Sequence, residues 1–247
     1  MLKALSISIL LLVSAPSIGS DKTTSAHAKK SLQIYKTIIE LPTVAGRGKV
    51  PEMTNYLAKE LRSAGFKPED LQILPTGETA LFIARYKGNK GSQKKPILLL
   101  GHMDVVEALD KDWERPPFKL TQDDKYFYGR GTVDNKLGIA MLTSTFIRLK
   151  KEGFVPDRDI YLAFSGDEET GMQTTRILAN KRPELAKAEY ALNSDAGGGD
   201  LDKKGKAMAY LVQAAEKTYV SFELTLRNKG GHSSRPRPDN AIYELAT

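Results

Sequence analysis

The sequence predicts an α/β domain built on a mixed sheet, followed by the beginning of a second, α+β domain. Two observations support this fold class. Amphipathic helical stretches alternate along the chain with short apolar runs of the kind that buried strands show. Several of these runs end on a glycine or a turn residue and then present His, Asp or Glu. Open α/β sheets place their chemistry at such strand ends.

The composition limits the kinds of partner and site. The 247 residues carry a formal net charge of +7, but basic and acidic residues are interleaved and the basic clusters are short. This pattern is more typical of a solvated surface than of a nucleic-acid groove, so we expect no nucleic-acid partner. Because the chain has no cysteine, disulfides and thiolate metal sites are excluded. Any metal site must use His, Asp and Glu.

The N-terminus has the layout of a secretory signal peptide. Lys3 precedes an apolar run from Ala4 to Val13, and small residues with Pro16 continue to Ser20. The run is shorter than the roughly 20 apolar residues that a membrane span needs. We expect a signal peptide at residues 1–20 and a periplasmic or secreted protein, with an uncleaved anchor on the lipid side as the alternative. Residues 21–29 are expected to be a polar lead-in.

Two amphipathic helices are expected next. The first begins at Ser31 and is ended by Pro42, and the second begins after Pro51 and is ended by Gly65. Their apolar residues recur at three- and four-residue spacing: Leu32, Tyr35, Ile38 and Ile39 in the first helix, and Met53, Leu57, Leu61 and Ala64 in the second.

The remaining elements alternate between the two types. Strands are expected at residues 71–75, 79–86, 97–100, 126–128, 159–165, 190–193 and 219–226. Helices are expected at residues 137–150 and 170–180, after Pro183, and from Asn240 onward.

Acidic and imidazole side chains lie at the ends of three of these strands and at the start of one helix. They are His102 and Asp104 after strand 97–100, Asp134 before helix 137–150, Asp167, Glu168 and Glu169 after strand 159–165, and Asp195 after strand 190–193. Singly, each has an ordinary explanation, because strand-end acids are often turn residues and Asp134 could be a helix N-cap. Four such ends in succession are harder to assign to turn chemistry. The three adjacent acids also require a nearby cation, and their own run contains no Lys or Arg.

These residue types suit a metal site for hydrolysis. Zinc binds imidazole and carboxylate ligands, and a two-metal site needs a carboxylate that bridges. The ligand candidates, with Asp104 as the partner that orients the ring of His102, are His102, Asp134, Glu168, Glu169 and Asp195. Hydrolysis also needs a general base beside the metal. Glu168 and Glu169 can divide these roles, because adjacent side chains point in opposite directions.

Three motifs resemble those of the di-zinc aminoacylase/carboxypeptidase family of metallopeptidases: Gly101-His102-Met103-Asp104-Val105-Val106, Gly129-Arg130-Gly131 with Asp134, and Ser165-Gly166-Asp167-Glu168-Glu169 with Gly171. The family includes glutamate carboxypeptidase, acetylornithine deacetylase, succinyl-diaminopimelate desuccinylase and carnosinase-like dipeptidases. The resemblance covers the chain from about Ser31. It implies that residues 31–208 are the N-terminal part of a mixed-sheet, zinc-exopeptidase-like catalytic domain, which is incomplete here. Residues 209–247 would begin an α+β dimerisation or lid domain.

The resemblance also implies a role for each site residue. His102 and Asp195 would hold one zinc ion, Asp134 would bridge two ions, and Glu169 would hold the second. Glu168 would be the general base that passes a proton from water to the leaving amine. Cobalt or manganese could replace zinc.

Two further features follow from the resemblance. Family members tend to have a cis peptide directly after the bridging acid, which would be Asp134-Asn135. The segment from Asn228 to Ser234 resembles the start of the lid domain, where His232 would reach across a homodimer and help to polarise the scissile carbonyl. The alternative is a glycine-rich hairpin bend with an incidental histidine.

One part of the family pattern is missing. The second zinc ion of the family is completed by a histidine that follows the lid domain, and the histidines of this chain are His27, His102 and His232. None of them has that place, and the chain stops at Thr247 within a helical pattern that has no stop signal. We therefore expect an N-terminal fragment or a truncated product that holds the second ion weakly and has little activity.

The expected function is zinc-dependent hydrolysis of an amide bond in a small peptide or an N-acyl amino acid. Asp195, where several deacylases have glutamate, favours a carboxypeptidase or dipeptidase, and so does the export signal. The sequence does not identify the substrate side chain. The alternative is a non-catalytic protein that keeps the fold for dimerisation or partner binding. Glu168 argues against it, because a scaffold needs no base beside its ligands.

Overall fold

The computed structural model describes residues 22–218 and 220–246. The chain divides after Ala196 into two compact units, and each is described by itself. The expected signal peptide at residues 1–20 lies outside the described residues. Within the part of the chain that is described, no helix combines the length and the apolar character needed to cross a membrane.

A five-stranded mixed sheet forms the centre of the first unit, as the sequence predicts. Its strand order is β1-β2-β6-β3-β7. β1 pairs with β2, and β2 with β6, in antiparallel fashion, whereas β3 is parallel to both β6 and β7. The strands are β1 (Leu71–Thr76), β2 (Thr79–Tyr86), β3 (Ile97–His102), β6 (Ile160–Ser165) and β7 (Tyr190–Asn193).

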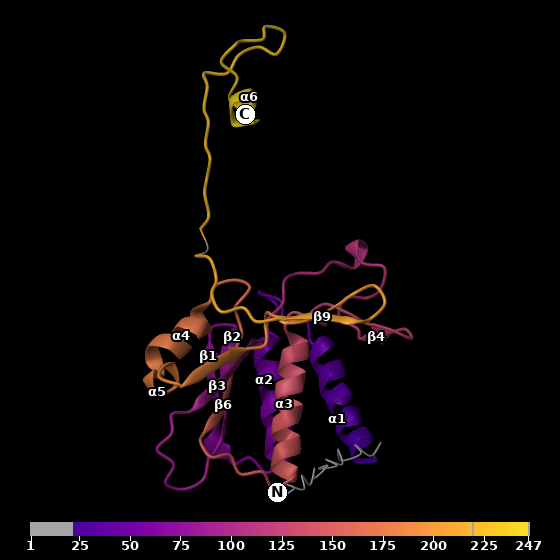
Figure 1. Cartoon of the computed structure of the whole chain (residues 1–247). Coiled ribbons are helices and arrows are strands. Elements are labelled where there is room, and N and C mark those ends of the chain that lie inside the picture. The colour runs from indigo at the N-terminus through magenta and orange to yellow at the C-terminus, as the bar shows by residue number, and fades with distance from the viewer. Residues whose placement is uncertain (1–21, 219, 247) are drawn as a thin grey trace, which may run out of the picture. The chain divides into compact units, whose positions relative to one another are not determined.

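Helices cover both faces of this sheet (Figure 1). Three pack on one face, α1 (Lys22–Ile39), α2 (Val50–Ser63) and α3 (Lys136–Lys151), and two on the other, α4 (Gln173–Lys181) and α5 (Pro183–Ala186). β2 shows why the strands read as continuous apolar runs: Phe82 packs among α1, α2 and α3, whereas Leu81 and Ile83 pack against α4 and α5. A strand buried on both faces has no polar side to alternate with.

The first helix begins earlier than the sequence pattern indicates. α1 starts at Lys22, so the expected start at Ser31 is wrong, and residues 22–29 of the expected polar lead-in are helical. Polar residues such as lysine are good helix formers, and the early turns have no apolar periodicity that would reveal them. Lys30 forms an ion pair with Glu60 of α2 at 2.6 Å, which ties this part of α1 to its neighbour.

The shorter elements complete the first unit. Two 3₁₀ turns lie at Pro68–Asp70 and Asp110–Asp112, and β4 (Thr121–Gln122) pairs with β5 (Phe127–Tyr128) in a separate two-stranded sheet. The edge strand β7 is largely uncovered, with Tyr190 and Leu192 each 57% exposed.

The second unit contains a hairpin and a terminal helix. β8 (Gly198–Leu201) pairs with β9 (Ala207–Leu211), and α6 spans Ala241–Ala246. The strand expected at residues 219–226 is wrong for its described part, because residues 220–226 have no strand structure. Apolar residues alternate there, but a strand also needs a paired neighbour, and among the described residues of this unit only β8 and β9 pair.

Candidate metal site

Three neighbouring strands of the first unit bring polar side chains to one edge of the sheet. β3 ends at His102, β6 ends at Ser165 and leads into the three acids 167–169, and β7 is followed by Asp195. Because β6, β3 and β7 run parallel, their carboxyl ends meet at the same edge. The pairing of His102 with Ser165 fixes the register between the first two. Asp134 comes from the loop that precedes α3.

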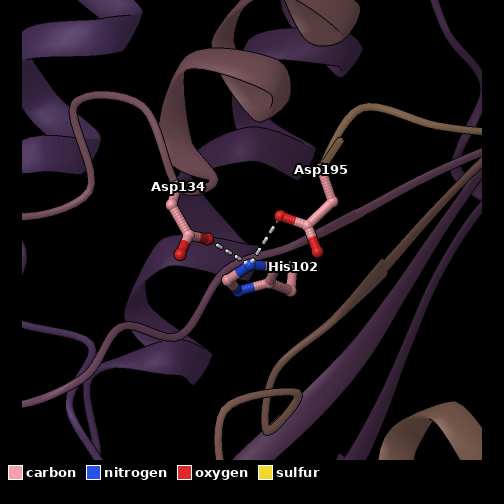
Figure 2. Close-up of side chains that lie close together, drawn as sticks. All are labelled: His102, Asp134 and Asp195. Atoms are coloured by element: carbon pink, nitrogen blue, oxygen red, sulfur yellow. Dashed lines mark hydrogen bonds and ion pairs between the residues drawn. The ribbon is translucent and has the colours of Figure 1, made fainter. Parts of the chain in front are cut away.

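His102, Asp134 and Asp195 form a compact cluster (Figure 2). Nε2 of His102 lies 2.7 Å from Oδ1 of Asp134 and 3.4 Å from Oδ1 of Asp195. One ligand atom from each of the three residues can be chosen so that these atoms all lie within 4.8 Å of one another. The ring is 2% exposed, whereas the Asp134 carboxylate is 61% exposed and that of Asp195 is 26% exposed. The cluster is therefore buried on the side of His102 and open on the side of the carboxylates, from which a ligand can approach.

The other ring nitrogen of His102 determines which nitrogen can bind a metal. Nδ1 lies 3.0 Å from the main-chain carbonyl oxygen of Asp104. A carbonyl oxygen only accepts hydrogen bonds, so Nδ1 carries a proton and donates it. In the neutral ring the lone pair is then on Nε2, which faces the two carboxylates.

The same surroundings change the acidity of the ring. Burial by itself would lower the pKa of His102, but the hydrogen bond and charge of Asp104, with the charges of Asp195 and Asp134, raise the pKa to about 10. These carboxylates therefore attract a cation to Nε2, which is either a proton or a metal ion. Imidazole nitrogens and carboxylate oxygens both bind zinc, with bonds of about 2.0–2.2 Å. The residues present fit such an ion.

Asp104 connects this cluster to the two glutamates. Its carboxylate accepts hydrogen bonds from the main-chain N–H groups of Glu168 and Glu169, at 3.0 and 2.9 Å. The same carboxylate lies 3.5 Å from Nδ1 of His102, which is longer than the bond to the Asp104 carbonyl. Asp104 thus holds the ring mainly through its main chain and the glutamate pair through its side chain. It is 4% exposed.

Both glutamates have elevated proton affinity. Burial raises the pKa of the Glu168 carboxyl, and the surrounding carboxylates add to this effect, although the nearby His102 opposes it. Burial likewise raises the pKa of Glu169, with Asp134 as the largest charge acting in the same direction. A carboxyl group whose pKa is moved toward neutrality is suited to general acid–base chemistry.

Asn135 and Ser194 support Asp195. The Asn135 side-chain amide donates to Oδ1 of Asp195 at 3.3 Å, and the Ser194 hydroxyl donates to Oδ1 of Asn135 at 2.9 Å. Two glycines leave room for this pair, because a Cβ at Gly138 would lie 2.3 Å from Oγ of Ser194 and one at Gly101 would lie 2.8 Å from Oδ1 of Asn135.

The Asp134-Asn135 peptide is cis, as the resemblance implies. Asp134 is not the N-cap of α3, since that position is occupied by Asn135, which makes no side-chain capping bond. The turn-chemistry explanation of Asp134 therefore does not apply, and its carboxylate faces His102 instead.

Sequence reasoning missed two residues next to the cluster. Lys136 is fully buried, and its Nζ donates to the carbonyl oxygen of Leu41 at 2.6 Å. Burial lowers the pKa of Lys136 to about 7, against the opposing charge of Asp104. The sequence signal for its burial was its position at the start of α3, a helix whose inner face carries Ile139 and Ala140.

The second missed role belongs to Asp167. Its carboxylate accepts hydrogen bonds from the main-chain N–H groups of Gln173 and Thr174, at 2.6 and 3.0 Å, and from the Thr174 hydroxyl. It therefore stabilises the first turn of α4, a structural role that Glu168 and Glu169 do not share. This bonding also explains how the first of three adjacent acids is accommodated without a nearby lysine or arginine.

The structure thus brings six of the seven candidate residues together in the first unit: His102, Asp104, Asp134, Glu168, Glu169 and Asp195. His232 lies in the second unit, where it is exposed and contacts Ser234.

Comparisons with known proteins agree with this geometry. Residues 98–241 match the family described as Peptidase family M20/M25/M40. The chain is 33% identical over 224 residues to the "Probable succinyl-diaminopimelate desuccinylase" of Staphylococcus aureus (strain MRSA252), covering 90% of this chain and 50% of the relative. It is 34% identical over 237 residues to the "N-fatty-acyl-amino acid synthase/hydrolase PM20D1" of Bos taurus, covering 87% and 44%. The chain spans about half the length of these relatives or less.

Solved structures show the same fold. The dipeptidase Dug1p from Saccharomyces cerevisiae superposes with a TM-score of 0.61 at 22% identity, covering 72% of this chain and 41% of that one. Human carnosine dipeptidase 1 gives a TM-score of 0.61 at 19% identity, covering 72% and 42%.

Proposed function

Because this chain belongs to the M20/M25/M40 family of metal-dependent peptidases and amidohydrolases, we propose that it is the metal-binding part of an enzyme that hydrolyses an amide bond. The observation that carries this proposal is the convergence of His102, Asp134 and Asp195, with Nε2 of the ring facing both carboxylates. The glutamate pair held by Asp104 adds the base that hydrolysis needs beside a metal.

A divalent metal ion, which we propose to be zinc with cobalt or manganese as substitutes, would be held by His102, Asp134 and Asp195. When bound, it would supply Lewis-acid stabilisation for the negative charge that develops on the substrate carbonyl oxygen. Asn135 and Ser194 hold the Asp195 carboxylate toward this position, and Asp104 holds the imidazole ring in the tautomer that can ligate.

Glu168 is the residue that we propose to move the proton. It takes a proton from the attacking water and gives it to the leaving amine, so the carboxyl ends the cycle as it began. The burial that raises its pKa makes the Glu168 carboxylate a stronger base toward the attacking water, and the carboxyl then passes this proton to the amine as the C–N bond breaks. The peptide N–H bonds to Asp104 fix its main chain during the transfer.

A second ion would be bound less firmly by the described residues. We propose Glu169 and Asp134 as its ligands, and two carboxylates without an imidazole leave the shell incomplete. This is why we propose that the 247-residue chain alone has little hydrolytic activity.

We propose small peptides or N-acyl amino acids as substrates. The relatives are named as a desuccinylase and an N-fatty-acyl-amino acid hydrolase, and the structural neighbours as dipeptidases, and all of these names imply an amide next to an amino acid. We also propose a homodimer formed through the lid domain, in which His232 polarises the scissile carbonyl.

Export is a separate proposal that is supported by Lys3 and the apolar run that follows it. N-terminal sequencing of the mature protein tests it. A mature chain that begins near Asp21 is expected, and a chain that retains Met1 in the cytosol would contradict export.

The hydrolase proposal is tested by metal content and amine release. Equilibrium dialysis with Zn²⁺ should give at least one tightly bound ion in the wild-type chain and in Glu168→Gln, and none at that affinity in His102→Gln. Release of primary amine from a panel of dipeptides and N-acyl amino acids should be slow but detectable for the zinc-loaded wild type, and Glu168→Gln should lower it by about 10²–10⁴-fold. Equal zinc binding in wild type and His102→Gln would overturn the proposal. A stable dimer that binds no zinc would instead support the non-catalytic alternative.

A further inference from the structure

A closed loop in the second unit presents His232. The side-chain amide of Asn228 donates to the carbonyl oxygen of Asp239 at 2.8 Å, which joins the two ends of the loop. Arg237 makes two parallel bonds to the Asp239 carboxylate, at 2.8 and 2.7 Å, and a longer one to the carbonyl oxygen of Gly230 at 3.4 Å. Paired bonds between arginine and a carboxylate have a fixed geometry. The loop around His232 is therefore held by its own residues.

Within this loop, Ser234 holds one nitrogen of the His232 ring. The main-chain N–H of Ser234 donates to Nδ1 of His232 at 3.2 Å, and the Ser234 hydroxyl lies 2.8 Å from the same nitrogen. A main-chain N–H can only donate, so Nδ1 must present its lone pair. A neutral imidazole carries one proton, which must then be on Nε2. The exposed nitrogen of this ring is a hydrogen-bond donor.

In their neutral forms, the two histidines of the proposed mechanism are thus held in opposite tautomers. Nδ1 of His102 faces a carbonyl oxygen, which leaves a lone pair on Nε2. Nδ1 of His232 faces an N–H group, which leaves a proton on Nε2. A lone pair suits a metal ion, and an N–H group suits an oxygen acceptor. In each case the partner is two residues further along the chain, Asp104 or Ser234.

We propose that Ser234 is a positioning residue that keeps His232 in the Nε2–H form, so that the neutral ring donates a hydrogen bond to the substrate carbonyl oxygen. This inference rests on the proposed function for its acceptor, but the tautomer itself does not depend on the reaction. No proton is transferred in this step. The ring stays neutral and stabilises the charge that develops on the oxygen.

The tautomer can be observed directly in the full chain. Long-range ¹H–¹⁵N correlation spectra of the imidazole rings, recorded where the ring is neutral, distinguish a protonated from an unprotonated Nδ1. The chain has three histidines, so loss of one ring pattern in His232→Gln identifies the signals of His232. We expect an unprotonated Nδ1 in the wild type.

Three substitutions at Ser234 separate the two contacts. Ser234→Pro removes both the N–H and the hydroxyl group, and the Nδ1–H form should increase several-fold. Ser234→Ala keeps the N–H group and should retain the Nε2–H form, and Ser234→Thr should match the wild type. A wild-type ring with its proton on Nδ1, or an unchanged tautomer ratio in Ser234→Pro, would overturn the proposal.

Activity of the zinc-loaded protein provides the second readout. Ser234→Pro should lower kcat about tenfold or more, with a smaller change in KM, as expected for a contact to the transition state. If the tautomer changes as expected and kcat does not, the role of Ser234 toward the substrate is overturned. The metal site and Glu168 are then unaffected, because their own test is zinc binding and the loss of activity in Glu168→Gln.

Discussion

Metal binding by this protein should compete with a proton on His102. The pKa of His102 is raised to about 10, because the hydrogen bond and charge of Asp104 and the charges of Asp195 and Asp134 outweigh the effect of burial. Nδ1 keeps its proton for the carbonyl of Asp104, so Nε2 is the nitrogen that must lose a proton before a metal ion can bind. At neutral pH the ring of the metal-free protein is therefore charged.

The size of the pH effect on Zn²⁺ affinity follows from the pKa of His102. At any pH below it, each unit of pH lowers the apparent affinity for the ion about tenfold, which is about 1.4 kcal/mol. Between pH 8 and pH 7 we expect a loss of about tenfold in Zn²⁺ affinity. Close to one proton should be released for each ion bound.

Isothermal titration calorimetry measures both quantities. Titrations with Zn²⁺ at one pH, in buffers of different ionisation enthalpy, give the number of protons released. His27→Gln is the matched control, because it removes a histidine of α1 that pairs with Glu152 and lies outside the cluster. Equal Zn²⁺ affinity at pH 7 and pH 8, or binding without proton release, would refute the inference that the His102 ring is charged in the metal-free protein.

The same shift affects the stability of the metal-free protein. The folded pKa of His102 lies above its ordinary value of 6.5, so the stabilising contribution is complete below about pH 6.5 and is lost as the pH rises through about 10. The contribution of Lys136 to stability changes with pH in the opposite direction. Burial lowers its pKa to about 7, so its destabilising contribution decreases as the pH rises. The difference in Tm between wild type and His102→Gln, measured in EDTA, should therefore shrink from pH 7 to pH 10. A constant difference would contradict the raised pKa.

Glu168→Gln should reduce hydrolysis by about 10²–10⁴-fold, the contribution of a general base, and leave Zn²⁺ affinity unchanged; a loss of Zn²⁺ affinity measured by calorimetry would make it a ligand instead. Gly138→Ala should weaken Zn²⁺ binding by about 10–100-fold, because the new Cβ would displace Ser194, which supports Asp195 through Asn135. Wild-type affinity in Gly138→Ala would show that this support is dispensable. Leu57→Ala should lower the free energy of unfolding in urea by about 2–5 kcal/mol, because the side chain is fully buried. The control Leu32→Ala, at a side chain that is 41% exposed, should change it by about 0.5 kcal/mol or less.

The sequence predicts the mixed sheet and its helices because their signals are local. Apolar residues in α2 recur with helical spacing, and those in β2 form a continuous run, so both elements follow from periodicity alone. The first turns of α1 could not be predicted in this way, because their polar residues have no apolar spacing. The segment at residues 220–226 has the strand pattern but no paired strand among the described residues of its unit.

The site residues were predictable as a group, and their individual bonds were not. Asp167, Glu168 and Glu169 are chemically alike in the sequence, and only the start of α4 determines that Asp167 bonds to that helix. The spacing of His102 and Asp104 suggests a contact between the ring and the carboxylate. The structure places the carboxylate 3.5 Å from Nδ1 and adds the closer main-chain carbonyl oxygen of Asp104, at 3.0 Å, which the spacing does not predict.

The two-sided bonding of Asp104 also has a consequence for transplanting the site into another protein. One residue sets the distance between the ring that binds the ion and the glutamate pair that includes the base, and it does so across two adjacent parallel strands. A graft would therefore have to copy the ends of β3 and β6 together, in this register. Copying the ligand residues without this strand pair would lose the spacing between the ring and the glutamate pair.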